Sequence, residues 1–185
     1  MIVNCVIGQA GSGKSTFIEE KFPKEEYIFF NVGKVLRSMF TCMKGRQDNK
    51  NVWEFANPFV YGTLKHCCNI SRANGYDVVL DGFPRDGGQL SHMDRYLSSP
   101  DLGGVSVVIH ALDIMKEEQL KRIKNRNGSV DKYQEERVDQ SRSDFNSIID
   151  GLELMFLNKK SPINYKIIWY AQKDGGFIIS REREN

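Results

Sequence analysis

The sequence predicts an α/β fold in which a five-stranded parallel sheet carries helices on both faces. Two observations predict it. Short apolar runs alternate along the chain with longer amphipathic segments, which is typical of strands joined by helical crossovers. A glycine-rich motif also lies directly between the first apolar run and the first helical segment. The 185 residues suffice for a single domain over 1–185 and are too few for two.

The predicted strands are short, nearly continuous apolar runs, as expected for a parallel sheet buried on both faces. They cover residues 2–7, 27–30, 77–81, 105–112 and 163–170. No internal repeat or linker interrupts this series. The runs therefore predict one continuous sheet with five strands.

Helical patterns fill the segments between these strands. They cover about 14–21, 33–43, 58–74, 89–97 and 115–126. Pro23 stops the first of them, Pro58 opens the third, and Gly75 fits the position just past its end. Beyond the break at 127–129, a long amphipathic pattern places one apolar face on Phe145, Ile148, Ile149, Leu152 and Phe156.

Composition excludes several classes of protein. A formal net charge of +2 with 27% charged residues gives no basic footprint for nucleic acid. No apolar stretch reaches the length of a membrane span, and the short run at the N-terminus lacks the features of a signal peptide. The four cysteines form no C-x-x-C pair, so we expect reduced structural thiols. These observations predict a cytoplasmic monomer without nucleic-acid or membrane partners.

The glycine-rich motif at residues 8–15 matches G-x-x-x-x-G-K-[ST] in full and lies between a strand and a helix. Such a loop surrounds phosphate oxygens with its backbone amides, and the helix that follows presents its positive end to the same anion. Lys14 is expected to reach the β- and γ-phosphates, and the Ser15 hydroxyl to bind Mg²⁺. The residues predicted to hold ATP here are Gly8, Ala10, Gly11, Ser12, Gly13, Lys14, Ser15 and Thr16.

A second motif, Asp-Gly-Phe-Pro-Arg at 81–85, follows the third predicted strand. Asp81 is placed to hold water around Mg²⁺, because the ends of neighbouring strands meet at one edge of a parallel sheet. The turn through Gly82 directs Arg85 across the site. A guanidinium binds two oxygens of a phosphate monoester at once, so Arg85 is a candidate for an acceptor phosphate.

Together the two motifs resemble the adenylate kinase family of nucleoside monophosphate kinases, in which D-G-F-P-R followed by Gln is a hallmark. The segment 32–37 is similar to the family's T-G-D-[LM]-L-R, with Val32 in place of a base-contacting Thr and Lys34 in place of an acid. The resemblance implies a P-loop three-layer fold with a helical acceptor-binding insertion at about 31–75 and a short lid at about 127–137. It implies acceptor contacts from Val32, Arg37, Gly82, Arg85 and Gln89.

The resemblance extends to the arginines that would close over the transferred group. Residues 122–126 resemble the family's R-[IL]-x-x-R, in which the first arginine stacks near the donor base and the second contacts phosphates. This implies Arg122 as a donor-binding residue and Arg126 as a catalytic residue. The lid arginine of the family's R-x-D-D motif has two partial candidates, Arg137 and Arg142, and the sequence does not choose between them.

The hypothesis is ATP-dependent phosphoryl transfer to a nucleoside or deoxynucleoside monophosphate, with Mg²⁺ as cofactor and ADP and a diphosphate as products. The acceptor phosphate is already an oxyanion, so no general base is needed, and the sequence offers no convincing one. Two alternatives stay open. One is a P-loop kinase for another small acceptor, such as an alcohol. The other is a nucleotide-binding regulatory protein with weak or no transferase activity.

Overall fold

A computed structural model describes the chain except residues 36–37, 39–48, 103, 159–160, 174–175 and 185. Its strands are β1 (Ile2–Gly8), β2 (Tyr27–Asn31), β3 (Asp77–Asp81), β4 (Ser106–Asp113), β5 (Asn164–Lys173) and β6 (Gly176–Glu184). Its α-helices are α1 (Lys14–Lys21), α3 (Asn49–Asn74), α4 (Gly87–Leu97), α5 (Lys116–Asn127) and α6 (Lys132–Asn158). A short 3₁₀ turn, η1, covers Pro100–Leu102.

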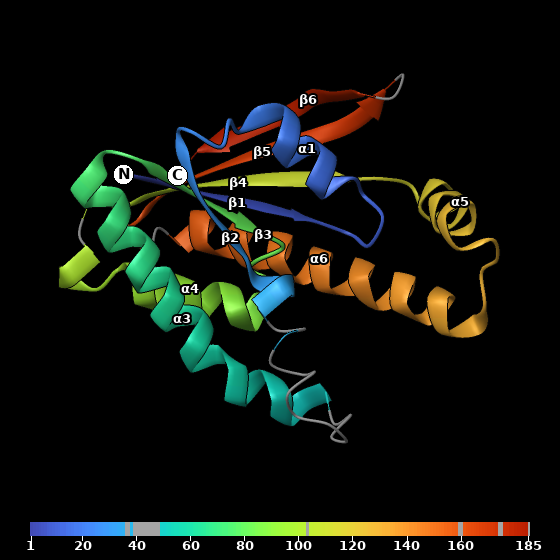
Figure 1. Ribbon diagram of the computed structural model, residues 1–185, viewed down its shortest axis with the longest axis horizontal. Coiled ribbons are helices and arrows are strands. Elements are labelled where there is room, and N and C mark those ends of the chain that lie inside the picture. Colours follow the sequence, from blue (N-terminus) through green and yellow to red (C-terminus); the bar gives the residue numbers. More distant parts are fainter. Residues whose placement is uncertain (36–37, 39–48, 103, 159–160, 174–175, 185) are drawn as a thin grey trace.

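The predicted α/β fold is confirmed. The strands form one sheet in the order β2-β3-β1-β4-β5-β6, and its first five strands are parallel. In Figure 1, α3, α4 and α6 lie on one side of this sheet and α1 on the other. A large core lies between the sheet and α3, α4 and α6, and a smaller aromatic one lies under α1. Strand β1 lies between β3 and β4 and is parallel to both, so the carboxyl ends of these three strands lie at the same edge of the sheet.

The sixth strand, β6, was not predicted. It pairs antiparallel with β5, and its sequence ends in four alternating charges. Those charges find partners on the neighbouring elements: Lys166 binds Glu182 and Glu184, and the Arg181 guanidinium lies 4.6 Å from the Trp169 ring centroid. The charged run by itself does not indicate a strand. It is stabilised there by partners on β5, which the local sequence does not reveal.

Helix α3 begins nine residues earlier than the predicted start at Pro58, which lies inside it. The prediction was wrong because one apolar face continues past the proline, with Ala56, Val60 and Leu64 all buried in the main core. Burial of that face offsets the hydrogen bond that a proline removes from a helix.

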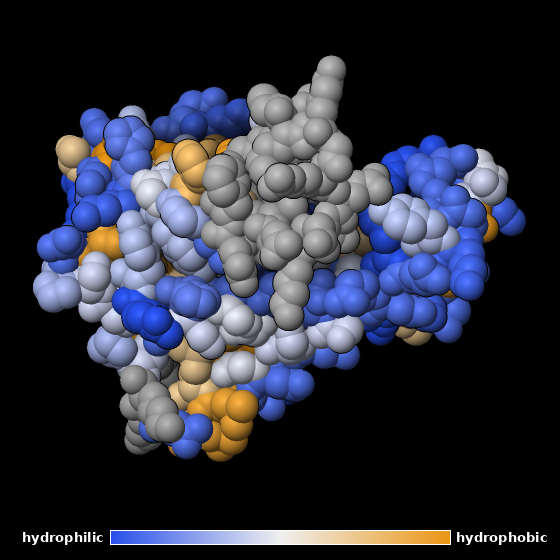
Figure 2. Space-filling model, turned by 90° about the horizontal axis from the view of Figure 1, so that it is seen from below, coloured by the Kyte–Doolittle hydropathy of each residue, from blue (hydrophilic) through white to orange (hydrophobic). Residues whose placement is uncertain are grey.

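The hydrophilic character of the surface agrees with the composition. Figure 2 shows the face that carries α3, α4 and α6, where the described apolar side chains lie in small groups among hydrophilic ones. Among the described residues, no helix combines the length and apolarity that crossing a membrane requires.

His110 on β4 joins the two neighbouring strands, β1 and β5, through buried polar contacts. Its Nε2 lies 3.1 Å from Asn4 Oδ1, and its Nδ1 lies 3.1 Å from the Tyr170 hydroxyl. Since Asn4 Oδ1 only accepts, Nε2 carries the proton and Nδ1 accepts from Tyr170. Burial, with a smaller effect from Lys21, lowers the pKa of His110 from 6.5 to about 4. The ring is therefore a neutral structural group.

We predict that His110 makes the fold sensitive to acid. Its folded pKa lies below its unfolded value, so its contribution is complete above about pH 6.5 and is lost as pH falls toward 4. The lost free energy of unfolding is about 3 kcal/mol. Denaturant titrations from pH 7 to pH 4 measure it. His110→Gln keeps one donor and one acceptor without titrating, so its curve should be flatter, and equal slopes in both proteins would contradict the prediction.

Candidate functional site

The phosphate-loop backbone between β1 and α1 depends on glycine at its start. A Cβ on Gly8 would lie 2.7 Å from the Leu112 carbonyl oxygen and 2.6 Å from Ser12 Oγ, so no side chain fits. Gly11 and Gly13 then take positive φ angles of 78° and 87°, which L-residues rarely adopt. These conformations turn the chain back so that α1 begins at Lys14, directly after the loop.

The Lys14 ammonium lies across this loop and satisfies its three protons within it. Its Nζ donates to the carbonyl oxygens of Gly8 at 2.8 Å and Gln9 at 2.9 Å, and to Ser12 Oγ at 3.5 Å. Burial lowers the pKa of Lys14 to about 8, against an opposing effect of the Asp81 carboxylate and with a further lowering by Arg85. The ammonium is thus partly removed from water and bonded to neutral carbonyl oxygens. A phosphate, which carries a full negative charge, would be a stronger partner for it than these carbonyls.

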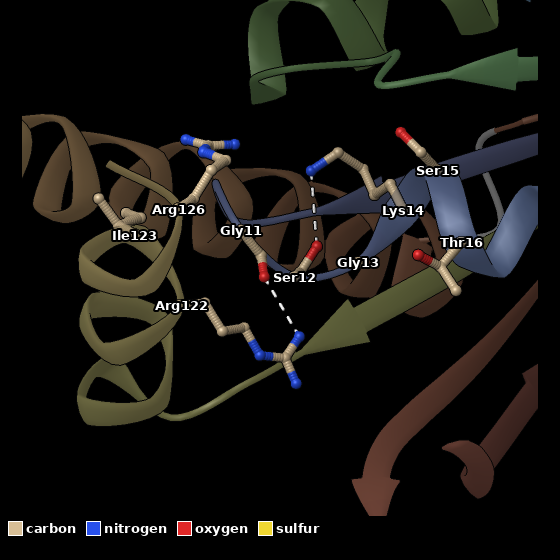
Figure 3. A pocket seen from close by; sticks show the side chains of 9 residues that line it. All are labelled: Gly11, Ser12, Gly13, Lys14, Ser15, Thr16, Arg122, Ile123 and Arg126. Atoms are coloured by element: carbon tan, nitrogen blue, oxygen red, sulfur yellow. Dashed lines mark hydrogen bonds between the residues drawn. The ribbon is translucent and has the colours of Figure 1, made fainter. Parts of the chain in front are cut away.

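A cavity of about 420 Å³ opens over the loop, a size within the usual range for small-ligand sites. Figure 3 shows the side chains of Lys14 and Arg126 on one side of the loop and that of Arg122 on the other. The residues that line the cavity are Gly11, Ser12, Gly13, Lys14, Ser15, Thr16, Arg122, Ile123 and Arg126. The structure thus brings most of the predicted ATP-binding residues together with the two arginines of α5.

Two predicted loop residues lie apart from this cavity. Gly8 packs against Leu112 at the end of β4. The amide of Ala10, expected to face a phosphate, donates to Ser141 Oγ on α6 at 3.2 Å. This bond attaches the loop to α6, which the motif alone does not reveal, and a phosphate contact of Ala10 stays a prediction.

The two arginines of α5 have different surroundings. Arg122 donates through Nε to Glu118 at 2.9 Å and through Nη1 to the Gly11 carbonyl at 3.3 Å, so it is tied to the loop itself. Arg126 is exposed, and its Nε donates to the Asn127 side chain at 3.2 Å. Arg122 thus borders the loop as a fixed cation, while Arg126 extends from the last turn of the helix.

The second motif, at residues 81–85, begins at the carboxyl end of β3, beside the loop. The Gly82 amide donates to the Val6 carbonyl at 3.0 Å, which holds the turn against β1. Arg85 donates through Nε to the Gly82 carbonyl at 3.2 Å. Asp81 and Arg85 both act electrostatically on Lys14, so the two predicted motifs meet at one place.

Two residues predicted to contact an acceptor are buried instead. Val32 is fully buried in the main core, so its side chain packs there. Gln89 is 4% exposed, and its Oε1 accepts from the Arg85 amide at 3.0 Å. Gln89 thus braces the turn that carries Arg85, and Val32 anchors the segment after β2, while their contacts with an acceptor stay predictions. Arg37 lies outside the described residues.

The two candidates for the lid arginine have different surroundings. The half-buried Arg142 donates through Nη1 to the Ile114 carbonyl at 2.8 Å, just after β4. Arg137 is exposed near the start of α6, with its guanidinium 6.0 Å from the Tyr133 ring centroid. Arg142 therefore attaches α6 to the segment that follows β4, while the Arg137 side chain is exposed to solvent.

The oxygens available for a metal are those of Ser15, exposed at the cavity, and Asp81. Within the described residues, no group of three His, Cys, Asp or Glu side chains is arranged to hold a metal. This donor set fits Mg²⁺, which keeps several water ligands and takes others from nucleotide phosphates. It does not fit a cation held by protein ligands alone.

Several contacts at the site were not predicted. The buried Gln9 side chain donates to Asp113 at 2.7 Å and so ties the loop to the end of β4. Ser141, in a long amphipathic pattern that gave no functional signal, accepts from the Ala10 amide and from the Gln119 side chain. Asn31, the residue before Val32, bonds to Asp81. Each becomes relevant only because another segment of the chain is folded against it.

The comparisons with known proteins agree with this fold. The sequence matches the family described as AAA domain over residues 3–148. No curated protein matches the chain. Among solved structures, a chain of the Pnkp1/Rnl/Hen1 RNA repair complex is similar with a TM-score of 0.54 and 16% identity, covering 83% of this chain and 45% of that one. This protein thus spans less than half of the RNA repair chain.

A second similar structure comes from the PezAT chromosomal toxin-antitoxin system of Streptococcus pneumoniae. It has a TM-score of 0.58 and 16% identity, and covers 98% of this chain and 71% of that one. At this identity both likenesses show the fold alone.

We predict that ATP affinity depends on the charge of Lys14. The ammonium attracts phosphate and the neutral amine does not, so affinity should fall as pH rises above about 8. Isothermal titration of ATP between pH 7 and 9.5 measures this fall. Lys14→Arg stays charged throughout and should give a flat profile, while Lys14→Ala should bind weakly at every pH with an unchanged fold. A wild-type profile as flat as that of the arginine variant would overturn this assignment.

Proposed function

Because the chain belongs to the AAA domain family, whose members are nucleotide-binding P-loop proteins of the kinase-like type, we propose that it transfers the γ-phosphoryl group of ATP to a nucleoside or deoxynucleoside monophosphate. The products are ADP and the corresponding diphosphate. The family supports phosphotransferase chemistry in general. The proposal adds the choice of acceptor, which is supported by the resemblance of residues 81–85 to the adenylate kinase motif.

One observation carries the proposal: the turn that leads to Arg85 is held against the end of β1 by the Gly82–Val6 hydrogen bond, and the Gly8 carbonyl at the end of the same strand accepts from the Lys14 ammonium. A donor phosphate on the loop and an acceptor phosphate on Arg85 would therefore lie at the same edge of the sheet. Phosphoryl transfer needs this proximity, because its main requirements are in-line positioning and neutralisation of charge. A protein that only binds nucleotides has no such need for a second phosphate-binding cation.

Each charged group then has a distinct task. Lys14 and the amides of 11–15 hold the donor phosphates, and Arg85 holds and directs the acceptor phosphate. Arg122 and Arg126 border the cavity on the α5 side, where cations offset the charge that spreads over the transferred group. Ser15 and Asp81 would hold Mg²⁺, which would supply further charge neutralisation.

A second acceptor class is favoured by a specific observation. An alcohol acceptor needs a general base, and Asp144 on α6 is a half-buried carboxylate near Asp86 and Arg85. Burial raises its pKa, against the effect of its hydrogen bond from Gln140, which measures 2.7 Å. Among the described carboxylates, Asp144 is thus a candidate for deprotonating a hydroxyl.

An assay of ADP formation over a panel of acceptors tests the proposal. The panel contains the common ribo- and deoxyribonucleoside monophosphates, small alcohols, and an RNA oligonucleotide with a 5′-hydroxyl, since one similar structure belongs to an RNA repair complex. Turnover with a monophosphate well above the water background supports the proposal. Turnover with hydroxyl acceptors alone would replace it with the second class, and ATP binding without turnover would point to a regulatory protein.

We predict that Arg85→Ala leaves ATP affinity nearly unchanged and weakens monophosphate binding. A charge-assisted bidentate contact is worth about 1.5–3 kcal/mol, so KM for the monophosphate should rise about tenfold or more. Turnover should fall as well, because the attacking oxygen loses its alignment. Arg85→Lys should rescue little, since a point charge lacks the planar fork. Steady-state kinetics with each substrate varied, beside a thermal melt, give the answer, and an unchanged KM and kcat in the alanine variant would refute this role.

Asp144→Asn separates the two acceptor classes. A monophosphate needs no base, so its turnover should stay within a few-fold of wild type in this variant. A hydroxyl acceptor should lose turnover by about 10²-fold or more, because general-base catalysis contributes that much. The comparison uses the acceptors that the wild-type protein accepts in the panel. A large loss with a monophosphate would show that Asp144 has a part in the transfer that this proposal lacks.

A further inference from the structure

Asn31, the last residue of β2, makes two hydrogen bonds that connect different parts of the site. Its Nδ2 donates to Oδ2 of Asp81, the candidate for holding water around magnesium. Its Oδ1 accepts from the backbone amide of Lys34 at 2.7 Å, in the helical turn 32–35 that follows the strand. One half-buried amide thus contacts both the metal side and the first turn of the proposed acceptor segment.

The sheet register explains this geometry. Strands β2 and β3 are parallel neighbours, and Asn31 is paired directly with Asp81 at their carboxyl ends. Two side chains at paired positions of adjacent strands lie side by side, within hydrogen-bond reach. Parallel pairing therefore brings Asn31 to Asp81 without any contribution from the loops beyond it.

The chemistry of the side chain explains why an amide suits this position. Asparagine has two donor protons and one acceptor oxygen in a fixed plane, so it serves a carboxylate and a backbone amide at the same time. Aspartate would place a second negative charge beside Asp81. Serine would reach the nearby amide and not the neighbouring strand. An apolar residue would serve neither partner.

The bond to Asp81 bears on the phosphate loop as well. Asp81 is paired with Val6 of β1, two residues before the phosphate loop begins at Gly8, and it acts electrostatically on Lys14. A partner that fixes one carboxylate oxygen also fixes the direction of the other. Partners of this kind commonly change metal affinity by about 10–100-fold when they are removed.

We propose that Asn31 is a positioning residue that orients Asp81 toward magnesium–ATP and fixes the turn 32–35, so that binding of the metal nucleotide and of the acceptor are coupled. The metal half of this inference stands on nucleotide binding alone, and the acceptor half rests on the proposed function. Coupling follows because a carboxylate held in place by the bound nucleotide also holds Asn31, and through it the amide of Lys34.

Two variants separate the halves. Asn31→Ser keeps an oxygen that can accept from Lys34 and loses the donor to Asp81, whereas Asn31→Leu loses both. Asn158→Ser is the matched control, since Asn158 lies at the end of α6 and donates only to the Leu154 carbonyl among the described contacts. Thermal melts establish that each variant is folded.

The readouts are binding measurements. The first is the magnesium concentration that half-saturates binding of a fluorescent ATP analogue, which should rise about tenfold in both Asn31 variants and stay unchanged in the control. Affinity for the analogue in EDTA should be the same in all proteins. The second is the dissociation constant of a monophosphate with and without a magnesium-bound, non-hydrolysable ATP analogue, where coupling should fall in Asn31→Leu most of all.

The outcomes keep this inference distinct from the proposed function. A shifted magnesium dependence in a protein that binds no monophosphate would support the metal half and count against the proposed acceptor. A magnesium dependence within twofold of wild type in both folded variants would overturn the metal half. Undiminished coupling in Asn31→Leu, in a protein that does bind a monophosphate, would overturn the acceptor half.

Discussion

The close packing of Gly8 against the end of β4 is the constraint on which the site depends. Because no Cβ fits between Gly8 and the Leu112 carbonyl, only glycine allows the end of β1 to pack this closely against β4 before the loop 9–13 leads into α1. The tight turn leaves the carbonyls of Gly8 and Gln9 directed at the Lys14 ammonium. A desolvated cation and its loop thereby become fixed at the centre of the sheet, and the other charged groups are arranged around that cation.

Helix α6 is attached to the phosphate loop, to the chain after β4 and to the start of α4. Ser141 accepts from the loop amide of Ala10, Arg142 donates to the chain just after β4, and Ser147 accepts from the Gly87 amide at the start of α4. A single helix thus contacts the donor loop, the central sheet and the turn beyond the acceptor motif. Movement of α6 would change the spacing between the phosphate loop and the turn that carries Arg85, so its packing on the core sets the geometry that the proposed transfer needs.

The charges around Lys14 balance one another. Asp81 favours its charged form, while burial and Arg85 disfavour it. The ammonium is therefore held in place without being neutralised by a single strong ion pair, and it stays available to a phosphate. The neutral amide of Asn31 donates a hydrogen bond to the Asp81 carboxylate and so adds no charge to this balance.

The sequence by itself determined the parallel sheet, the phosphate loop and the neighbourhood of Asp81 and Arg85, because these depend on local patterns and on the rule that strand ends meet at one edge. The start of α3, the strand β6 and the burial of Val32 and Gln89 were decided by the tertiary structure. In each case the deciding partners come from distant segments: an apolar face that outweighs Pro58, Lys166 for the charges of β6, and the Arg85 amide for Gln89. Local patterns record what a residue prefers, and packing decides which of those preferences the folded chain can satisfy.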